Sequence, residues 1–274
     1  MTSGVQLTGS LSGLNFDVVA HLLRPFLLGM PRITATVLVL PLLPQQTFPV
    51  LVRTALVVAL VLGAYRMLAA IPALDWSPLQ WVAFTAKESF IGAVIGYATG
   101  VLIWVFASLG SLIDNQAGMS NATIFDPFGG HQGGPYSSFM SQLGVLLFIG
   151  LGGLYVLIAL LYESLSIWPV ASFSPAVGDA LRDFALLRFE SLMSLVVRLA
   201  APVIAALVIV ELGIGLINRV APQLNVFFFS MPIKGALAAL MLALLLARLA
   251  DVARTEVDWL RGLAPLLKQT WGPR

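Results

Sequence analysis

The residue types that most often carry out catalysis are scarce and scattered in this chain. The two histidines, His21 and His131, stand far apart, and no HExxH, GxSxG, paired-carboxylate or glycine-rich phosphate motif surrounds them. Cysteine is absent, which excludes disulfides, thiolate metal sites and a cysteine nucleophile. The sequence therefore predicts neither an enzyme nor a site for a metal or a cofactor.

Several charged residues lie inside otherwise apolar stretches, where an ionisable group is a functional candidate by default. Snorkelling of long side chains to a membrane interface explains those near stretch ends. Glu211 and Arg198 lie too deep for that explanation and would need a polar partner or a wet cavity. We predict that Glu211 pairs with Lys234 as a buried polar pair. A proton or ion relay would use such residues too, so a stand-alone small-solute or ion-coupled transporter is an alternative function. The full set is Arg24, Arg32, Arg53, Lys87, Glu88, Glu163, Arg198, Glu211 and Lys234.

The most distinctive segment runs from Asp114 to Tyr136 and joins two apolar stretches. It contains no Lys or Arg, and its glycines and prolines allow compact turns. It also carries apolar side chains that are unusual in a solvated linker, namely Met119, Ile124, Phe125 and Phe128. Such a loop could sit inside a narrow space. An ordinary outer connection of unusual composition is the competing interpretation.

Three glycines, Gly92, Gly96 and Gly100, recur at every fourth position of one apolar stretch. This spacing places bare backbone along one helix face, where a second helix can approach closely. Such repeats are common in membrane helices of every function. We therefore predict helix packing at these glycines and nothing narrower.

The elements that must position these residues are apolar and helical. Of the 274 residues, 59% are apolar and only 10% are charged, a surplus that an ordinary soluble core cannot hide. Six stretches are long enough, or nearly so, for a membrane span of about 20 residues. We expect a multi-pass, all-α protein with spans near 16–40, 50–74, 81–113, 138–162, 191–217 and 232–250.

The distribution of Lys and Arg sets the expected orientation, because cytoplasmic loops carry an excess of these residues. The C-terminal segment is the clearest case, so both termini are expected in the cytoplasm. From Arg248 to Leu263, polar and apolar residues alternate at helical spacing, which predicts an amphipathic helix. It would lie on the membrane surface or present a docking face to a cytoplasmic partner. We expect one helical domain over 1–250 and a C-terminal amphipathic helix or tail over 251–274. The scattered basic residues indicate no nucleic-acid partner.

An ordered set of motifs resembles the SctT/FliR family, the T or R component of type III secretion and flagellar export gates. The run DNQAGMS at 114–120 followed by FDP at 125–127 is similar to the family's loop signature. Further matches are LYES at 161–164 with WP at 168–169, FSP at 173–175, NRVAPQLNVF at 218–227 and MPIK at 231–234. The WP and MPIK regions look more like the injectisome branch than the flagellar one. The glycine-rich tract at 129–136 departs from the family pattern.

The resemblance implies a structural subunit of an export gate in the bacterial inner membrane. Family members fold as helical hairpins in a closed helical assembly with about five R-type and about four S-type subunits around the export channel. Further implied partners are the U-type switch subunit, the cytoplasmic export platform, exported unfolded proteins in transit and membrane lipid. The assembled gate is implied to be raised toward the periplasmic side. Its subunits are implied not to adopt the plain six-span arrangement that hydropathy predicts, because apolar helices can be covered by neighbouring subunits as well as by lipid.

Carried over residue by residue, the family's channel plug falls on the segment after Asp114. Its outgoing arm is Asn115, Gln116, Ala117, Gly118, Met119, Ser120, Asn121 and Ala122, and its returning arm is Phe125, Asp126 and Pro127. Small residues would let this loop enter a narrow lumen, and Met119 would help to form a deformable seal. The expected mechanism is steric gating.

Overall fold

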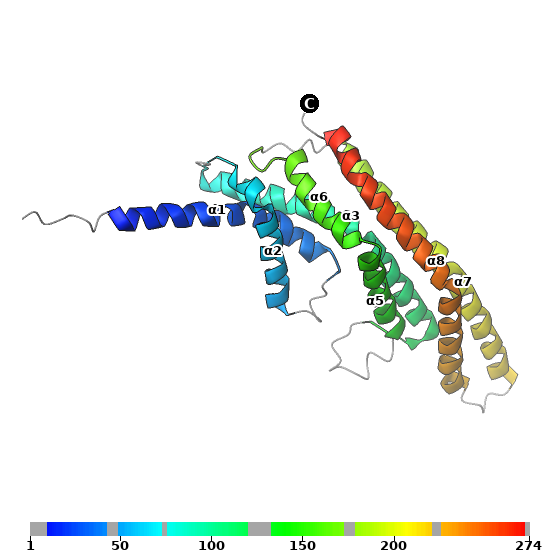
Figure 1. The fold of residues 1–274 in the computed structure, drawn as a ribbon. Coiled ribbons are helices and arrows are strands. Elements are labelled where there is room, and N and C mark those ends of the chain that lie inside the picture. Colours follow the sequence, from blue (N-terminus) through cyan, green and yellow to red (C-terminus); the bar gives the residue numbers. More distant parts are fainter. Residues whose placement is uncertain are drawn as a thin grey trace, which may run out of the picture. The chain divides into compact units, whose positions relative to one another are not determined.

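The computed structural model describes residues 10–42, 49–72, 76–119, 133–172, 179–220 and 226–271. Within these ranges the regular structure is helical, which confirms the all-α prediction (Figure 1). The helices are α1 (Ser10–Val39), α2 (Val50–Ala69), α3 (Pro78–Ala117), α5 (Pro135–Gly150), α6 (Gly153–Ile167), α7 (Asp179–Val220) and α8 (Val226–Trp271).

Five of these helices are long and apolar enough to cross a membrane, and a sixth span is possible if α5 and α6 count as one. The expected span over 138–162 corresponds to α5 and α6, which are bent by 68° at the break between them, so a continuous helix across this stretch is not what the structure shows. Hydropathy is continuous across this break and so does not reveal it. The last two spans are longer than expected, since α7 has 42 residues and α8 has 46.

The chain divides into two compact units. The first contains residues up to Tyr97 together with 160–175, and the second contains 98–159 and 176–270. Both α3 and α6 therefore contribute one end to each unit. The expected boundary after residue 250 lies inside α8, and the separate C-terminal tail over 251–274 stays a prediction.

In the first unit, α1 packs against α2 and against the first part of α3. The contact with α3 is close at two glycines. A β-carbon added to Gly92 would collide with the carbonyl of Arg32, and one added to Gly96 would lie 2.8 Å from the carbonyl of Thr36. The hydroxyl of Thr36 donates a hydrogen bond of 2.9 Å to the carbonyl of Gly92. Bare backbone on α3 thus lets the two helices touch.

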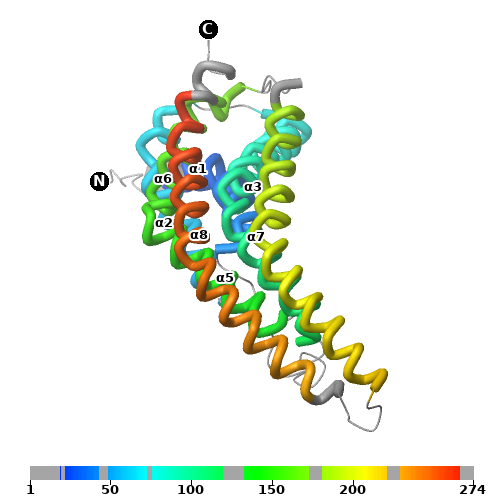
Figure 2. The backbone as a smooth tube through the Cα atoms, turned by 90° about the vertical axis from the view of Figure 1, so that its right-hand side faces the viewer, coloured from blue at the N-terminus to red at the C-terminus, as the bar shows by residue number. Residues whose placement is uncertain are grey.

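In the second unit, α7 and α8 run antiparallel beside each other, as both views show (Figures 1 and 2). An ion pair of 3.0 Å joins Arg188 of α7 to Glu256 of α8, and the Arg188 guanidinium lies 3.9 Å from the ring centre of Trp259. A pair of 3.3 Å joins Glu211 to Lys234 near the other end. Charged contacts therefore pin this long hairpin at two places.

The amphipathic segment predicted near the C-terminus is the second half of α8. Its apolar residues are buried inside the second unit, while Arg254, Asp258 and Arg261 are exposed. This face packs against protein, so it is not available to a membrane surface. The buried residues are Leu249, Val252, Val257, Leu260 and Leu263.

Candidate functional site

The candidate site is the root of the loop that joins α3 to α5, in the second unit. Of the predicted plug residues, Asn115, Gln116 and Ala117 form the last turn of α3, and Gly118 and Met119 follow it. The others, Ser120, Asn121, Ala122, Phe125, Asp126 and Pro127, lie outside the described residues. The structure describes the chain again from Gly133.

The end of α3 follows from local chemistry at Gly118. Its φ angle of +77° lies in the left-handed region, which glycine adopts without a steric penalty. Its N–H donates to the carbonyl of Asn115 at 3.2 Å, which satisfies one of the free carbonyls at the helix end. Gly118 therefore turns the chain out of α3 at the first residue of the loop.

The side chain of Asp114 ties the two ends of the loop together. It is buried, and its two carboxylate oxygens accept hydrogen bonds from the backbone N–H groups of Tyr136 at 3.0 Å and Ser137 at 2.7 Å. These are free donors in the first turn of α5, so a carboxylate from α3 caps α5 and matches its helix dipole. Gly134 lies against this carboxylate where a β-carbon would not fit.

A second set of contacts ties the loop root to α7 and α8. The Gln116 amide donates to one oxygen of Glu211 at 2.8 Å, and Lys234 lies 3.3 Å from the other oxygen. Lys234 also donates to the Gln116 carbonyl at 3.4 Å, and the Tyr136 hydroxyl donates to the Gly235 carbonyl at 2.6 Å. The structure thus brings together the predicted pair Glu211 and Lys234. Lys234 is buried, but the Glu211 side chain is 53% exposed, so only half of the pair is buried.

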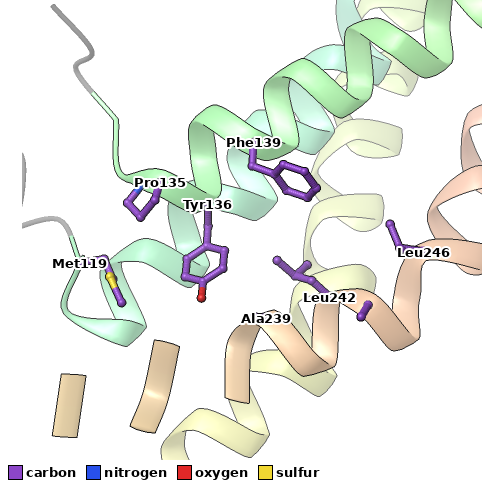
Figure 3. Close-up of a pocket in the computed structure, with 8 residues that line it drawn as sticks. Met119, Pro135, Tyr136, Phe139, Ala239, Leu242 and Leu246 are labelled. Carbon is purple, nitrogen blue, oxygen red and sulfur yellow. The ribbon is translucent and has the colours of Figure 1, made fainter. Parts of the chain in front are cut away.

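An apolar cavity of about 410 Å³ opens beside this root (Figure 3). Figure 3 shows Met119 from the loop root and Tyr136 from the start of α5 facing side chains of α8. The terminal methyl of Met119 also reaches toward Gly235, where an added β-carbon would lie 2.6 Å from it. The cavity is lined by Met119, Pro135, Tyr136, Phe139, Ala239, Leu242, Ala243 and Leu246.

The sequence as a whole matches the family model described as "Bacterial export proteins, family 1" over residues 23–259. The chain belongs to this family, the SctT/FliR family. That stretch contains both helices that carry the loop root and nearly all of the α7–α8 hairpin. Membership places the chain in a bacterial protein export apparatus, as a multi-pass membrane subunit of a larger secretion complex.

Three relatives show how far the similarity extends. Yop proteins translocation protein T of Yersinia pestis is 34% identical over 229 residues, which are 83% of this chain and 88% of that protein. Flagellar biosynthetic protein FliR of Bacillus subtilis is 26% identical over 254 residues, which are 91% of this chain and 98% of that protein. Surface presentation of antigens protein SpaR of Salmonella typhimurium is 26% identical over 231 residues, which are 82% of this chain and 84% of that protein. This member of the SctT/FliR family is therefore similar to its relatives over most of their length.

The helix-packing glycines occupy different surroundings. Gly92 and Gly96 lie at the close approach of α3 to α1 described above, in the first unit. Gly100 is buried and belongs to the part of α3 in the second unit. In the second unit, α3 approaches α5 just as closely at Gly110. A β-carbon there would lie 2.5 Å from backbone atoms of Tyr136 and Ser137. Close backbone approach at a glycine of α3 therefore occurs in both units, although Gly110 lies outside the repeat.

Sequence reasoning missed a buried charge network in the first unit. The Arg32 guanidinium donates to both oxygens of Glu88, at 2.6 and 3.0 Å, and both side chains are almost completely buried. It also donates to the Ser164 hydroxyl and the Trp168 carbonyl, both at 2.9 Å. Lys87 lies 2.8 Å from Glu88. The signal was present, because three charges of both signs lie within apolar stretches, but the sequence does not show which of them meet.

Arg198 is the other residue expected to need a polar partner or a wet cavity, and that expectation stays a prediction. In the structure its side chain is exposed on the surface of α7. Depth along an apolar helix therefore says little about burial within the chain, because position along the axis and position around it are independent.

Proposed function

We propose that this chain is a structural subunit of a type III secretion export gate in the bacterial inner membrane. It contributes part of the channel wall, and the loop between α3 and α5 serves as the plug that unfolded proteins pass. Family membership supports the export role. The geometry of the loop root supports the more specific assignment of a plug.

The observation that carries the proposal is the pair of hydrogen bonds from the Tyr136 and Ser137 N–H groups to the Asp114 carboxylate, which we call the Asp114 clamp. A gate loop must return to one place after each passage. If its two ends were not held together, the loop would lose conformational entropy each time they came together again. Here one buried carboxylate holds the last turn of α3 to the first turn of α5, so the two ends of the loop stay together. The loop tip can then yield to a passing chain while its root keeps its position.

The composition of the loop root fits a seal that does not bind its cargo. Met119 presents a flexible thioether to an apolar cavity, and Gly118 adds no side chain. Among the described residues of the loop, Gln116 makes its polar contacts at the root, where Gln116, Glu211 and Lys234 satisfy one another. Unfolded chains of any sequence would therefore meet a compliant apolar surface with few groups to which they could bind.

The exposed surface of α7 supports partners on the channel wall. The helix has 42 residues, which is about 63 Å at 1.5 Å per residue, roughly twice the hydrocarbon thickness of a bilayer. Large apolar side chains are exposed along it from Leu186 to Val220. Lipid cannot cover a stripe of that length on an upright helix. We assign the remainder to R-type and S-type subunits, with the switch subunit and the export platform as further partners.

A loop-shortening experiment tests this function. Residues 115–117 belong to α3, so the sharper variant removes 120–127 and leaves the clamp intact. Ion or dye leak is measured in cells that co-express the neighbouring subunits, and co-purification shows that the complex has assembled. We expect normal assembly with a raised leak. An unchanged leak in an assembled complex would remove the plug assignment, and purification of the chain alone as a self-contained transporter would overturn the gate assignment.

A further inference from the structure

The break between α5 and α6 has features of a hinge. With 16 and 15 residues, each helix alone is shorter than the ~20 residues that cross a bilayer, and together they pass as one span bent by 68°. Non-helical backbone within an apolar segment is tolerated where other groups satisfy its polar atoms. The contacts at this break show which groups satisfy its backbone N–H and carbonyl groups.

Glycines set the backbone at the break. Gly152 has a φ of +82°, a conformation that other residues rarely adopt. Its N–H donates to the Ile149 carbonyl at 3.0 Å, and its own carbonyl accepts from Val156 at 3.2 Å, the first turn of α6. No atom lies within 4 Å of a β-carbon added to Gly150. The bend therefore needs glycine at Gly152 and has open space beside Gly150, while a β-carbon at Gly153 would lie 2.6 Å from the Phe148 ring.

Arg261 of α8 satisfies the carbonyl at the bend. Its Nη2 donates to the carbonyl of Leu151 at 2.9 Å, and its Nη1 donates to Asp258 at 2.6 Å. A cation at the C-terminal end of α5 also matches the helix dipole. The same nitrogen, Nη2, lies 3.5 Å from the β-carbon position of Gly152. A side chain 110 positions away in the chain thus reaches the backbone of the bend.

We propose that the α5–α6 break is a hinge and that Arg261 is the latch that holds its bent form. Loss of the latch frees the Leu151 carbonyl and lets the angle between α5 and α6 change. Asp258 keeps the guanidinium aimed at the bend. The second half of α8 thereby controls the angle between α5 and the first turn of α6, independently of whether the α3–α5 loop is a plug. Hinges of this kind are a few element-terminal residues that absorb the change in φ and ψ.

Hydrogen exchange on the full-length chain tests the latch through the peptide covering 145–160. Arg261→Ala is compared with Arg254→Ala, a matched control on the same exposed face of α8. Arg254 has its own ion pair with Asp251 three positions earlier. Opening of the bend exposes the amides of Leu151, Gly152 and Val156. We expect exchange about tenfold faster in Arg261→Ala, because a charge-assisted hydrogen bond is lost, and no change in Arg254→Ala.

A spin-label measurement separates a hinge from general loosening. The chain lacks cysteine, so labels at Gln142→Cys on α5 and Tyr155→Cys on α6, both exposed, need no background mutations. We expect Arg261→Ala to broaden the interlabel distance distribution, Arg261→Lys to restore it in part, and Arg254→Ala to leave it unchanged. Equal exchange rates and equal distances in Arg261→Ala and Arg254→Ala would overturn the proposal. Faster exchange along all of α5 and α6, with an unchanged distance distribution, would show fraying and would overturn it too.

Discussion

The charge network of the first unit and the loop root of the second both join acids to bases, but they differ in burial. In the first, Glu88 and Arg32 are almost completely buried, and the guanidinium makes hydrogen bonds to the carboxylate, a hydroxyl and a carbonyl. In the second, Glu211 is 53% exposed although Lys234 is buried. One network is closed within the chain, and the other keeps an open side.

The difference in burial predicts different tolerance to change in the two networks. A closed, buried network specifies one packing of the helices, because any other arrangement would leave a charge without partners. An open network tolerates change at its exposed side and can accept a neighbour there. The following predictions test this contrast, beginning with the variant of largest expected effect.

Removal of the central carboxylate of the first unit should be the most damaging change. Glu88→Ala leaves Arg32 and Lys87 without their shared counter-charge inside the protein. We expect the free energy of unfolding to fall by about 3–5 kcal/mol, the usual loss when one partner of a buried pair is removed. Reversible unfolding in mixed micelles measures this. Asp251→Ala, which breaks an exposed ion pair on α8, serves as the control and should change stability by less than about 1 kcal/mol. Similar losses in the two variants would contradict the closed-network description.

A β-carbon at Gly92 should separate α1 from α3. Gly92→Ala places a methyl group against the Arg32 carbonyl, and we expect a loss of about 1–3 kcal/mol from the displaced helix. At Gly213 of α7 no atom lies within 4 Å of the added carbon, so Gly213→Ala should be neutral or stabilise by up to about 1 kcal/mol through helix propensity. Thermal unfolding of the two variants gives the comparison. We expect Gly92→Ala to lower the stability and Gly213→Ala not to lower it. A stability change of the same sign in both variants would mean that the α1–α3 contact is not tight.

Loss of the Asp114 clamp should act on the loop root locally. Asp114→Ala leaves the N–H groups of Tyr136 and Ser137 without an acceptor, at about 1–3 kcal/mol. Hydrogen exchange in the first turn of α5 should accelerate, while exchange in α1 and α2 should not change. Asp114→Asn keeps one acceptor oxygen, so its exchange rate in this turn should lie between those of the unchanged protein and of Asp114→Ala. Protection of this turn that survives Asp114→Ala would show that the clamp does not hold the loop root.

The smallest effect is expected at the open side of the second network. Glu211→Gln removes a charge that is half solvated and keeps an oxygen for Lys234, so we expect a stability change below about 1 kcal/mol in the isolated chain. Glu211→Leu gives the matched apolar variant and should cost more, because Lys234 loses its partner. Unfolding in mixed micelles measures both. A loss for Glu211→Gln as large as that for Glu88→Ala would remove the distinction between the two networks.

Several features of this protein follow from its sequence because they depend on composition and local order. The apolar excess predicts helices that cross a membrane, and the motifs at 114–127 and 231–234 place the chain in its family. The pairing of Glu211 with Lys234 was also accessible. Both lie in apolar segments near the short connection between α7 and α8, so a hairpin brings them together.

Other features depend on which helices meet, and local sequence does not encode this. Arg32 and Glu88 are 56 positions apart, and each looks like a single charge in an apolar stretch until α1 packs on α3. The bend at Gly152 interrupts a hydropathy pattern that continues across it, and its latch comes from α8. The apolar face of α8 from Leu249 to Leu263 is equally compatible with a membrane surface or a protein core until its covering residues are known. Hydropathy measures transfer out of water and is the same whichever apolar neighbour receives the side chain, so only the tertiary structure decided between lipid and protein.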